Sequence, residues 1–293
     1  MKMRYNLFLT FSLLATSILA YKADLIIFSC DRPIQYVALM ESVQKNMTNI
    51  GEIFVIYRAS TERFDAAYEE AKRLIDTPHY CKQSANPAAD FRDLTLACLN
   101  NCTNPYVFFA VDDIVSTAPV DIAACIDALE ETHSYGFYLR LGCNLTYCYP
   151  MNVQQPVPHG MVYGENYFRW RFSDGVYDWN YPHSVDMTIF RKEDVVRQLT
   201  GLQFKSPNTL ESSWAGAIGH TYDQYGICFL KSPIVNIPLN RVQNDYGNRH
   251  AKAMEVEDLL LLFNLGMKID INLLQGCTNS AAHMDYNPTF VMR

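Results

Sequence analysis

The chain is short of charge, and it lacks several patterns that identify other classes of protein. Charged side chains make up 19% of its 293 residues, and 24 basic residues are outnumbered by 31 acidic ones. A net charge of −7 argues against sequence-independent electrostatic binding of nucleic acid, so no nucleic-acid partner is expected. Internal repeats and low-complexity tracts are also absent. With 49% apolar residues, the chain is expected to be globular with a substantial core.

None of the nine cysteines lies in the paired pattern of a zinc site. Cys98 and Cys102 are one helical turn apart, and Cys143 and Cys148 flank a short segment. Either pair could form a disulfide in an oxidising compartment. Free buried thiols are the simpler interpretation, and we favour it.

The N-terminal segment has the order of a secretory signal peptide, with two basic residues followed by a mostly apolar stretch over 5–20. The stretch is short for a transmembrane helix, which needs about 20 residues. Ile18 stands where a small residue is expected before cleavage, so an uncleaved anchor is the alternative. We predict a signal peptide or signal anchor at residues 1–20, with membrane association through it. The protein would then be in the secretory pathway or membrane-anchored, a cytoplasmic location being the alternative.

Strand and helix patterns alternate from residue 24 onward. Apolar runs predict strands at 24–29, 52–57 and 106–111. Helical spacing and capping residues predict helices at 34–45, 61–74, 90–99 and 121–131. This order predicts an α/β fold with a mixed, mainly parallel sheet and helices on both faces.

Residues 142–182 differ in composition, because they are rich in proline and in aromatic rings. They are predicted to form a long irregular loop or a small excursion over the sheet edge. Their rings could stack on the faces of a sugar or could cover the core, and both interpretations are kept. Regular structure is expected to resume at 184–190, with helices at 193–199, 209–218 and 255–265.

The strand predicted at 106–111 runs directly into two carboxylates, Asp112 and Asp113. Charge next to a buried strand needs a compensating cation, and oxygen ligands at a strand end suit Mg²⁺ or Mn²⁺ carrying a phosphorylated substrate. The alternative is that the two acids cap a turn or a helix. We predict a metal site.

In parallel sheets, ligands bind beyond the carboxyl ends of the strands. The loops after the three predicted strands open on that edge. The polar side chains expected to converge there are Asp31, Arg32, Arg58, Ser60, Asp112 and Asp113.

Three of these turns resemble the nucleotide-sugar half of a GT-A-fold glycosyltransferase. They read Ser-Cys-Asp-Arg-Pro at 29–33, Ile-Tyr-Arg-Ala-Ser at 56–60 and Ala-Val-Asp-Asp-Ile at 110–114. Segments 187–192, 207–211 and 237–243 resemble the acceptor half of family-two-like members. The resemblance implies a GT-A-like (Rossmann-like) domain over 21–293, with a nucleotide-sugar half at about 24–141 and an acceptor half at about 142–293.

In that family an Asp-x-Asp element holds a divalent cation on the nucleotide diphosphate. Asp113 matches its final acid and Asp112 its middle position, while Val111 replaces the leading acid. His283 lies where some relatives supply a histidine to the metal, and a mixed carboxylate and imidazole set favours Mn²⁺ over Mg²⁺. His250 is a weaker rival.

The resemblance also implies contacts with a nucleotide-sugar donor, of which a UDP-sugar is favoured. The residues implied are Ser29, Asp31, Arg32, Tyr57, Arg58 and Asp112. Many relatives carry an acidic pair where this chain has Tyr57 and Arg58. Tyr57 could stack on a nucleobase and Arg58 could reach a phosphate, the alternative being an ordinary surface arginine.

Inverting members of the family place a catalytic base in the region of Glu211, at the start of a predicted helix. Such a base takes the proton of the acceptor hydroxyl. The alternative is a first-turn glutamate favoured by the helix dipole. Asp186 is the competing base, and we favour Glu211.

The function expected is a metal-dependent, inverting glycosyltransferase that moves a sugar to a hydroxyl of a glycan, lipid or protein. A nucleotidyl or phosphoryl transferase on the same fold is the second enzyme hypothesis. An exported glycan-binding or degenerate transferase-like protein without activity is the third hypothesis.

Overall fold

The computed structural model describes residues 20–217, 219–243, 245–247, 249–251 and 254–293. Except for Ala20, the predicted signal peptide or anchor lies outside the described residues. Among the helices of the described part, none is both long enough and apolar enough to cross a membrane.

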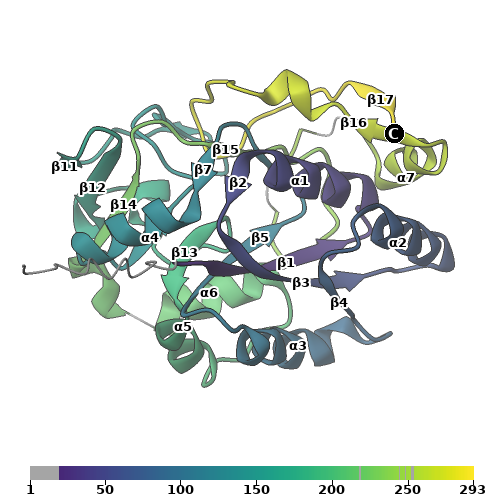
Figure 1. The fold of residues 1–293 in the computed structure, drawn as a ribbon, viewed down its shortest axis with the longest axis horizontal. Coiled ribbons are helices and arrows are strands. Elements are labelled where there is room, and N and C mark those ends of the chain that lie inside the picture. Colours follow the sequence, from purple (N-terminus) through teal and green to yellow (C-terminus); the bar gives the residue numbers. More distant parts are fainter. Residues whose placement is uncertain (1–19, 218, 244, 248, 252–253) are drawn as a thin grey trace, which may run out of the picture.

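A nine-stranded sheet lies at the centre of the described chain, in the order β11-β12-β14-β8-β13-β5-β1-β3-β4 (Figure 1). From edge to edge the strands are β11 (Gly160–Tyr163), β12 (Tyr167–Arg171), β14 (Tyr225–Phe229), β8 (Gly136–Tyr138), β13 (Thr188–Arg191), β5 (Tyr106–Val111), β1 (Ala23–Cys30), β3 (Ile50–Arg58) and β4 (His79–Lys82). Strands β5, β1, β3 and β4 are mutually parallel. Traced through the other pairings, only β12 and β13 run the opposite way. The prediction of a mixed, mainly parallel sheet is confirmed.

Helices cover both faces of this sheet (Figure 1). Buried side chains of α1 (Pro33–Asn46), α2 (Glu62–Leu74), α4 (Ile122–Glu131) and α7 (Val256–Asn264) form one core cluster. Those of α3 (Pro87–Asn101), α5 (Lys192–Leu199) and α6 (Pro207–Ala217) form another. Along β1 the side chains alternate between the clusters, with Leu25 and Ile27 in the first and Ile26 and Phe28 in the second. A strand buried on both faces therefore reads as a continuous apolar run.

The helix starts follow from their first residues. Pro33 and Pro87 stand in the first turns of α1 and α3, where the missing N–H costs nothing. The side chain of Thr61 accepts a hydrogen bond from Phe64 N at the start of α2, and Asp121 caps α4 in the same way. The strands and helices predicted for the first half are confirmed.

The prediction of an irregular segment over 142–182 is wrong for residues 160–171. Two strands of this region, β11 and β12, extend the central sheet. Along β12 the side chains alternate, and Phe168 and Trp170 are buried in a third cluster together with Phe172 and Trp179. These four rings therefore fill the core, and Phe168 and Trp170 do so because they alternate with outward-facing residues at the period of a strand. The strands β4, β8 and β14 were not predicted.

Smaller elements complete the described chain. They are β2 (Met47–Thr48), β6 (Ile114–Ser116), β7 (Val120–Asp121), β9 (Tyr147–Cys148), β10 (Val153–Gln154), β15 (Ile234–Asn236), β16 (Met267–Ile269), β17 (Phe290–Met292), η1 (Phe172–Asp174), η2 (Tyr177–Asn180), η3 (Gly219–Asp223) and η4 (Ile271–Leu274). The nine cysteines are free thiols, which confirms the favoured interpretation, and neither candidate pair forms a disulfide.

Candidate active site

A cavity of about 880 Å³ opens at the edge where β1, β3 and β5 end. Its lining includes Ser29 near the end of β1, Arg32 just after it, Arg58 at the end of β3, and Asp112 and Asp113 after β5. Parallel strands bring their carboxyl ends to one edge, so the convergence expected from the sequence is observed for these residues.

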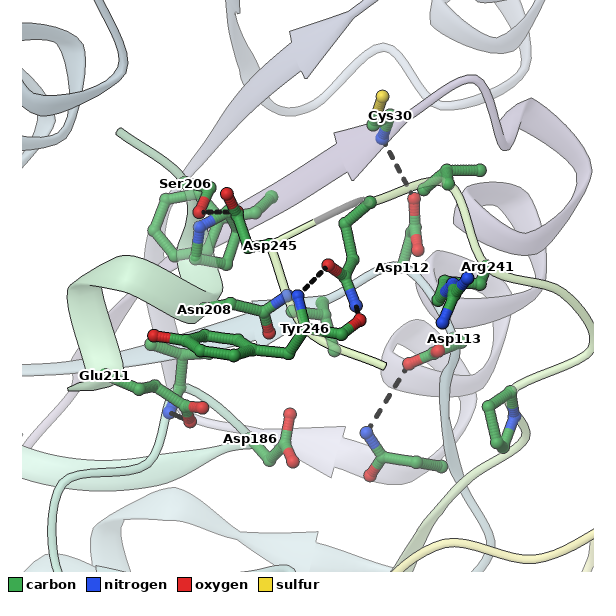
Figure 2. Close-up of a pocket in the computed structure, with 18 of the residues that line it drawn as sticks. Cys30, Asp112, Asp113, Asp186, Ser206, Asn208, Glu211, Arg241, Asp245 and Tyr246 are labelled. Atoms are coloured by element: carbon green, nitrogen blue, oxygen red, sulfur yellow. Dashed lines mark hydrogen bonds between the residues drawn. The ribbon is translucent and has the colours of Figure 1, made fainter. Parts of the chain in front are cut away.

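Three further polar residues reach the same cavity from later in the chain. Strand β13 is antiparallel to β5, which places Asp186, just before its first residue, at this edge. Strand β8 runs in the direction of β5, so Arg140 beyond its end also lies here. Glu211 enters from α6. Figure 2 shows Asp186 and Glu211 across the cavity from Asp113.

Asp112 is fixed by partners within the protein. One carboxylate oxygen, Oδ2, accepts hydrogen bonds from Ser29 Oγ at 2.9 Å and from Cys30 N at 3.1 Å. The other, Oδ1, accepts from Arg32 Nη1 at 3.0 Å. Only 3% of the residue is exposed. Both oxygens are therefore engaged within the protein, and Asp112 links the end of β1 to the end of β5. That it binds a metal stays a prediction.

Arg32 compensates the charge of Asp112 and Asp113 next to the buried strand β5. It contacts Asp113 Oδ2 at 3.5 Å, and its Nε donates to Asn240 Oδ1 at 2.8 Å. Burial raises the pKa of Asp112 and of Asp113 above the ordinary range, and the Arg32 guanidinium opposes this rise. Arg32 therefore joins the ends of β1 and β5 to the segment around Asn240.

Asp113 has the chemical surroundings of a metal ligand. Its Oδ1 accepts only a long hydrogen bond, 3.4 Å, from Asn236 Nδ2. Asn236 Oδ1 and His283 Nδ1 are buried and have no partner among the described residues. A carboxylate and an imidazole with unused donor atoms fit a divalent cation such as Mn²⁺.

Within the described ranges, no group of three or more His, Cys, Asp or Glu side chains is arranged to hold a metal ion. The predicted set of Asp112, Asp113 and His283 is therefore not assembled. Asp113 and His283 remain the two residues that fit a cation.

Glu211 is a buried carboxylate with a raised pKa. Its Oε1 accepts a hydrogen bond from Val185 N at 2.7 Å, and its Oε2 lies 3.4 Å from the hydroxyl of Tyr181. Burial, with the charge of Asp186 as the second cause, raises the pKa of Glu211 to about 7. A base with a pKa near neutrality is well suited to proton abstraction at physiological pH. Asp186 itself lies 3.7 Å from His283, measured from Oδ2 to Nε2.

The other residues predicted to bind the donor differ in their placement. Arg58 lines the cavity. His250, the alternative to His283 as a metal ligand, also lines it. Asp31 instead ties two turns together, because its side chain accepts from Ser60 N at 2.7 Å. Tyr57 is 1% exposed and packs against Tyr68 in the core. No face of the Tyr57 ring is left for a nucleobase, so that expectation is corrected.

Sequence reasoning missed several polar residues of the cavity. Arg140, Tyr181, Asn236 and Asn240 all line it. Arg140 follows the three-residue strand β8, which is too short for a periodicity signal. Asn240 lies in segment 237–243, where the resemblance was noted without assigning a role to this residue.

No protein-family model matches the chain. Over 268 residues the chain is 26% identical to the bifunctional glycosyltransferase pgtA of Dictyostelium discoideum. The match covers 80% of this chain and 34% of that protein, so the chain spans about a third of the relative's length.

Two solved structures are weakly similar. S. aureus TarS 1–349 in complex with UDP has a TM-score of 0.41 at 15% identity, over 83% of this chain and 65% of that chain. The mannosyltransferase PcManGT from Pyrobaculum calidifontis, in complex with GDP-Man and Mn²⁺, has a TM-score of 0.40 at 11% identity, over 72% of this chain and 56% of that chain. Neither likeness carries a conclusion about this chain. The sequence match agrees with the resemblance carried by the strand-end turns: over 80% of its length, this chain is related to a glycosyltransferase.

Proposed function

We propose that the chain is a metal-dependent, inverting glycosyltransferase that uses a nucleotide-sugar donor. The observation that carries the proposal is the cavity that holds Glu211, with a pKa of about 7, together with Asp113 and His283. A base with a near-neutral pKa and a cation site in one cavity are what sugar transfer from a nucleotide diphosphate requires.

In the proposed step, Glu211 accepts the proton of the acceptor hydroxyl while the acceptor oxygen forms a bond to the anomeric carbon. The bond from that carbon to the diphosphate oxygen breaks, and its electron pair leaves with the nucleotide diphosphate. Attack from the opposite face inverts the anomeric configuration. Since Oε1 of Glu211 is held by Val185 N, Oε2 is the oxygen that takes the proton.

Asp113 and His283 would hold Mn²⁺ or Mg²⁺. When bound, the ion would neutralise the charge that develops on the leaving diphosphate. Arg58, at the rim of the cavity, is proposed to contact the diphosphate. Asp186 is proposed to help raise the pKa of the base, because its negative charge is the second cause, after burial, of the raised pKa of Glu211.

The proposal is tested by calorimetry against UDP, GDP, CDP and ADP, with and without Mn²⁺, and by assaying sugar release from the matching donors. We expect one diphosphate, with UDP as the first candidate, to bind more tightly with Mn²⁺ and its sugar to be transferred. Consumption of a nucleoside triphosphate and a sugar phosphate would instead identify a nucleotidyltransferase. Glycan binding without nucleotide affinity would identify a degenerate, non-catalytic protein.

A further inference from the structure

The cavity that holds Glu211 is lined by several tyrosine rings. Tyr149, Tyr177, Tyr181 and Tyr246 all contribute to its wall. Two of them are unusually open to solvent for aromatic residues, since Tyr177 is 45% exposed and Tyr246 is 46% exposed. Exposed rings at the wall of a polar cavity present their apolar faces to whatever enters it.

Tyr177 is held in this position against its backbone preference. Its φ angle is 52°, in the left-handed region that a bulky side chain avoids. Its hydroxyl has no hydrogen-bond partner among the described residues, so the conformation is not explained by a contact that the ring makes. Strained residues of this kind persist only where the surrounding structure determines them, and they cluster at ligand sites.

The backbone conformation of Tyr177 is held by the contacts of the next two residues of η2. Arg140 Nη1 binds Asp178 Oδ1 at 3.1 Å, and Arg140 Nη2 binds the carbonyl oxygen of Asp178 at the same distance. Trp179 is fully buried. These anchors fix η2 from inside and leave Tyr177 on the cavity wall.

Tyr246 approaches from a different segment. Its hydroxyl donates to Ser212 Oγ at 3.0 Å, which places the ring against α6. Figure 2 shows this ring on the side of the cavity where Glu211 and Asn208 lie. The hydroxyl of Tyr181 contacts Glu211 itself at 3.4 Å. Tyr181 and Tyr246 therefore lie beside the group proposed to activate the acceptor, and Tyr177 lines the same cavity.

We propose that the acceptor is a carbohydrate and that Tyr177 and Tyr246 form its binding subsite. A pyranose ring has an apolar C–H face that suits a tyrosine face, and hydroxyls that suit polar neighbours such as Asn208 and Ser212. A lipid tail would need a continuous apolar channel, whereas these polar side chains interrupt the wall. This inference rests on the proposed function and selects the glycan among the three acceptor classes.

The test is saturation-transfer NMR of a panel of methyl hexopyranosides with the full chain in the presence of UDP and Mn²⁺. A serine- and threonine-containing peptide and a short-chain lipid phosphate are run beside them. Tyr177→Gly is the informative variant, because it removes the ring and suits the positive φ angle. We expect at least one glycoside to bind, and Tyr177→Gly to weaken it by about tenfold with no loss of thermal midpoint.

Two controls separate the ring from general effects. Tyr177→Phe keeps the ring and should retain binding. Tyr222→Ala removes a tyrosine that is 46% exposed and does not line the cavity, and it should change nothing. Binding of the peptide or the lipid alone, or unchanged glycoside affinity in Tyr177→Gly, would overturn the inference while nucleotide binding still stood. If the wild-type chain does not bind a nucleotide, the proposed function itself is overturned.

Discussion

At the scale of single residues, the two adjacent acids have different tasks. Asp112 is enclosed by Ser29, Cys30 and Arg32, with both oxygens engaged. Asp113 keeps an oxygen with only one long contact, toward Asn236. The sequence shows the pair but does not distinguish its members, because the difference comes from a buried arginine supplied by another strand end.

This difference predicts opposite outcomes for two similar substitutions. Asp113→Ala should abolish the effect of Mn²⁺ on nucleotide affinity. It should also slow turnover, because several kcal/mol of transition-state stabilisation are lost. Asp112→Ala should instead remove the nearer of the two carboxylates that contact the buried Arg32, at 3.0 Å against 3.5 Å for Asp113, and leave the hydrogen bonds of Ser29 and Cys30 unmade, which costs about 1–3 kcal/mol of folding stability. Calorimetry with and without Mn²⁺, together with denaturant unfolding, measures both. Retained Mn²⁺ dependence in Asp113→Ala would refute the assignment.

Glu211 should also leave a signature in stability. Its pKa rises from an ordinary 4.5 to about 7 on folding, so the folded state binds the proton more tightly. The stability that this provides is complete below pH 4.5 and is lost as the pH rises to about 7, amounting to about 3 kcal/mol. Glu211→Gln carries no charge, so its stability relative to the wild type should increase between pH 4.5 and pH 8. A difference that stays constant over this range would show that the pKa is not raised.

At the scale of elements, η2 depends on one buried ion pair. The side chains of Arg140 and Asp178 are only 3% and 9% exposed, and Gln155 Nε2 donates to Asp178 Oδ2 at 3.1 Å. A buried pair of this kind positions the segment that it holds, since removing one partner leaves the other charge uncompensated.

Asp178→Ala should therefore destabilise the fold by about 3–5 kcal/mol. The matched control is Asp223→Ala, which breaks the exposed pair with Arg171 and should cost about 0–1 kcal/mol. Urea unfolding of the two variants beside the wild type provides the comparison. Equal, small losses in both would mean that the buried pair does not hold η2.

The elements that sequence could predict are those with a long, repeated pattern. Strands β1, β3 and β5 are continuous apolar runs, and α2 begins at a threonine cap. Strand β8 has three residues, and β12 lies among prolines and rings that suggest a loop. Such strands are selected by their neighbours in the sheet, and this information is not local.

At the scale of the whole molecule, the site exists because strand direction brings distant segments to one edge. The parallel strands deliver Arg32, Arg58 and Asp113 as their order predicts. The antiparallel strand β13 and helix α6 add Asp186 and Glu211 from the second half. The first group could be predicted from the order of the elements, whereas the second group was expected only from the family resemblance. The core position of Tyr57 could be predicted from neither.

The central claim is that Glu211 is the base of a sugar transfer. The most direct measurement is the transfer rate of Glu211→Gln and of Asp186→Asn beside the wild type, with nucleotide affinity measured on the same samples. Glu211→Gln should lower turnover by about 10²–10⁴ with nucleotide affinity unchanged, because the amide keeps the shape of the carboxylate and cannot take the proton. Undiminished transfer in Glu211→Gln, with transfer lost only in Asp186→Asn, would contradict the account and identify Asp186 as the base.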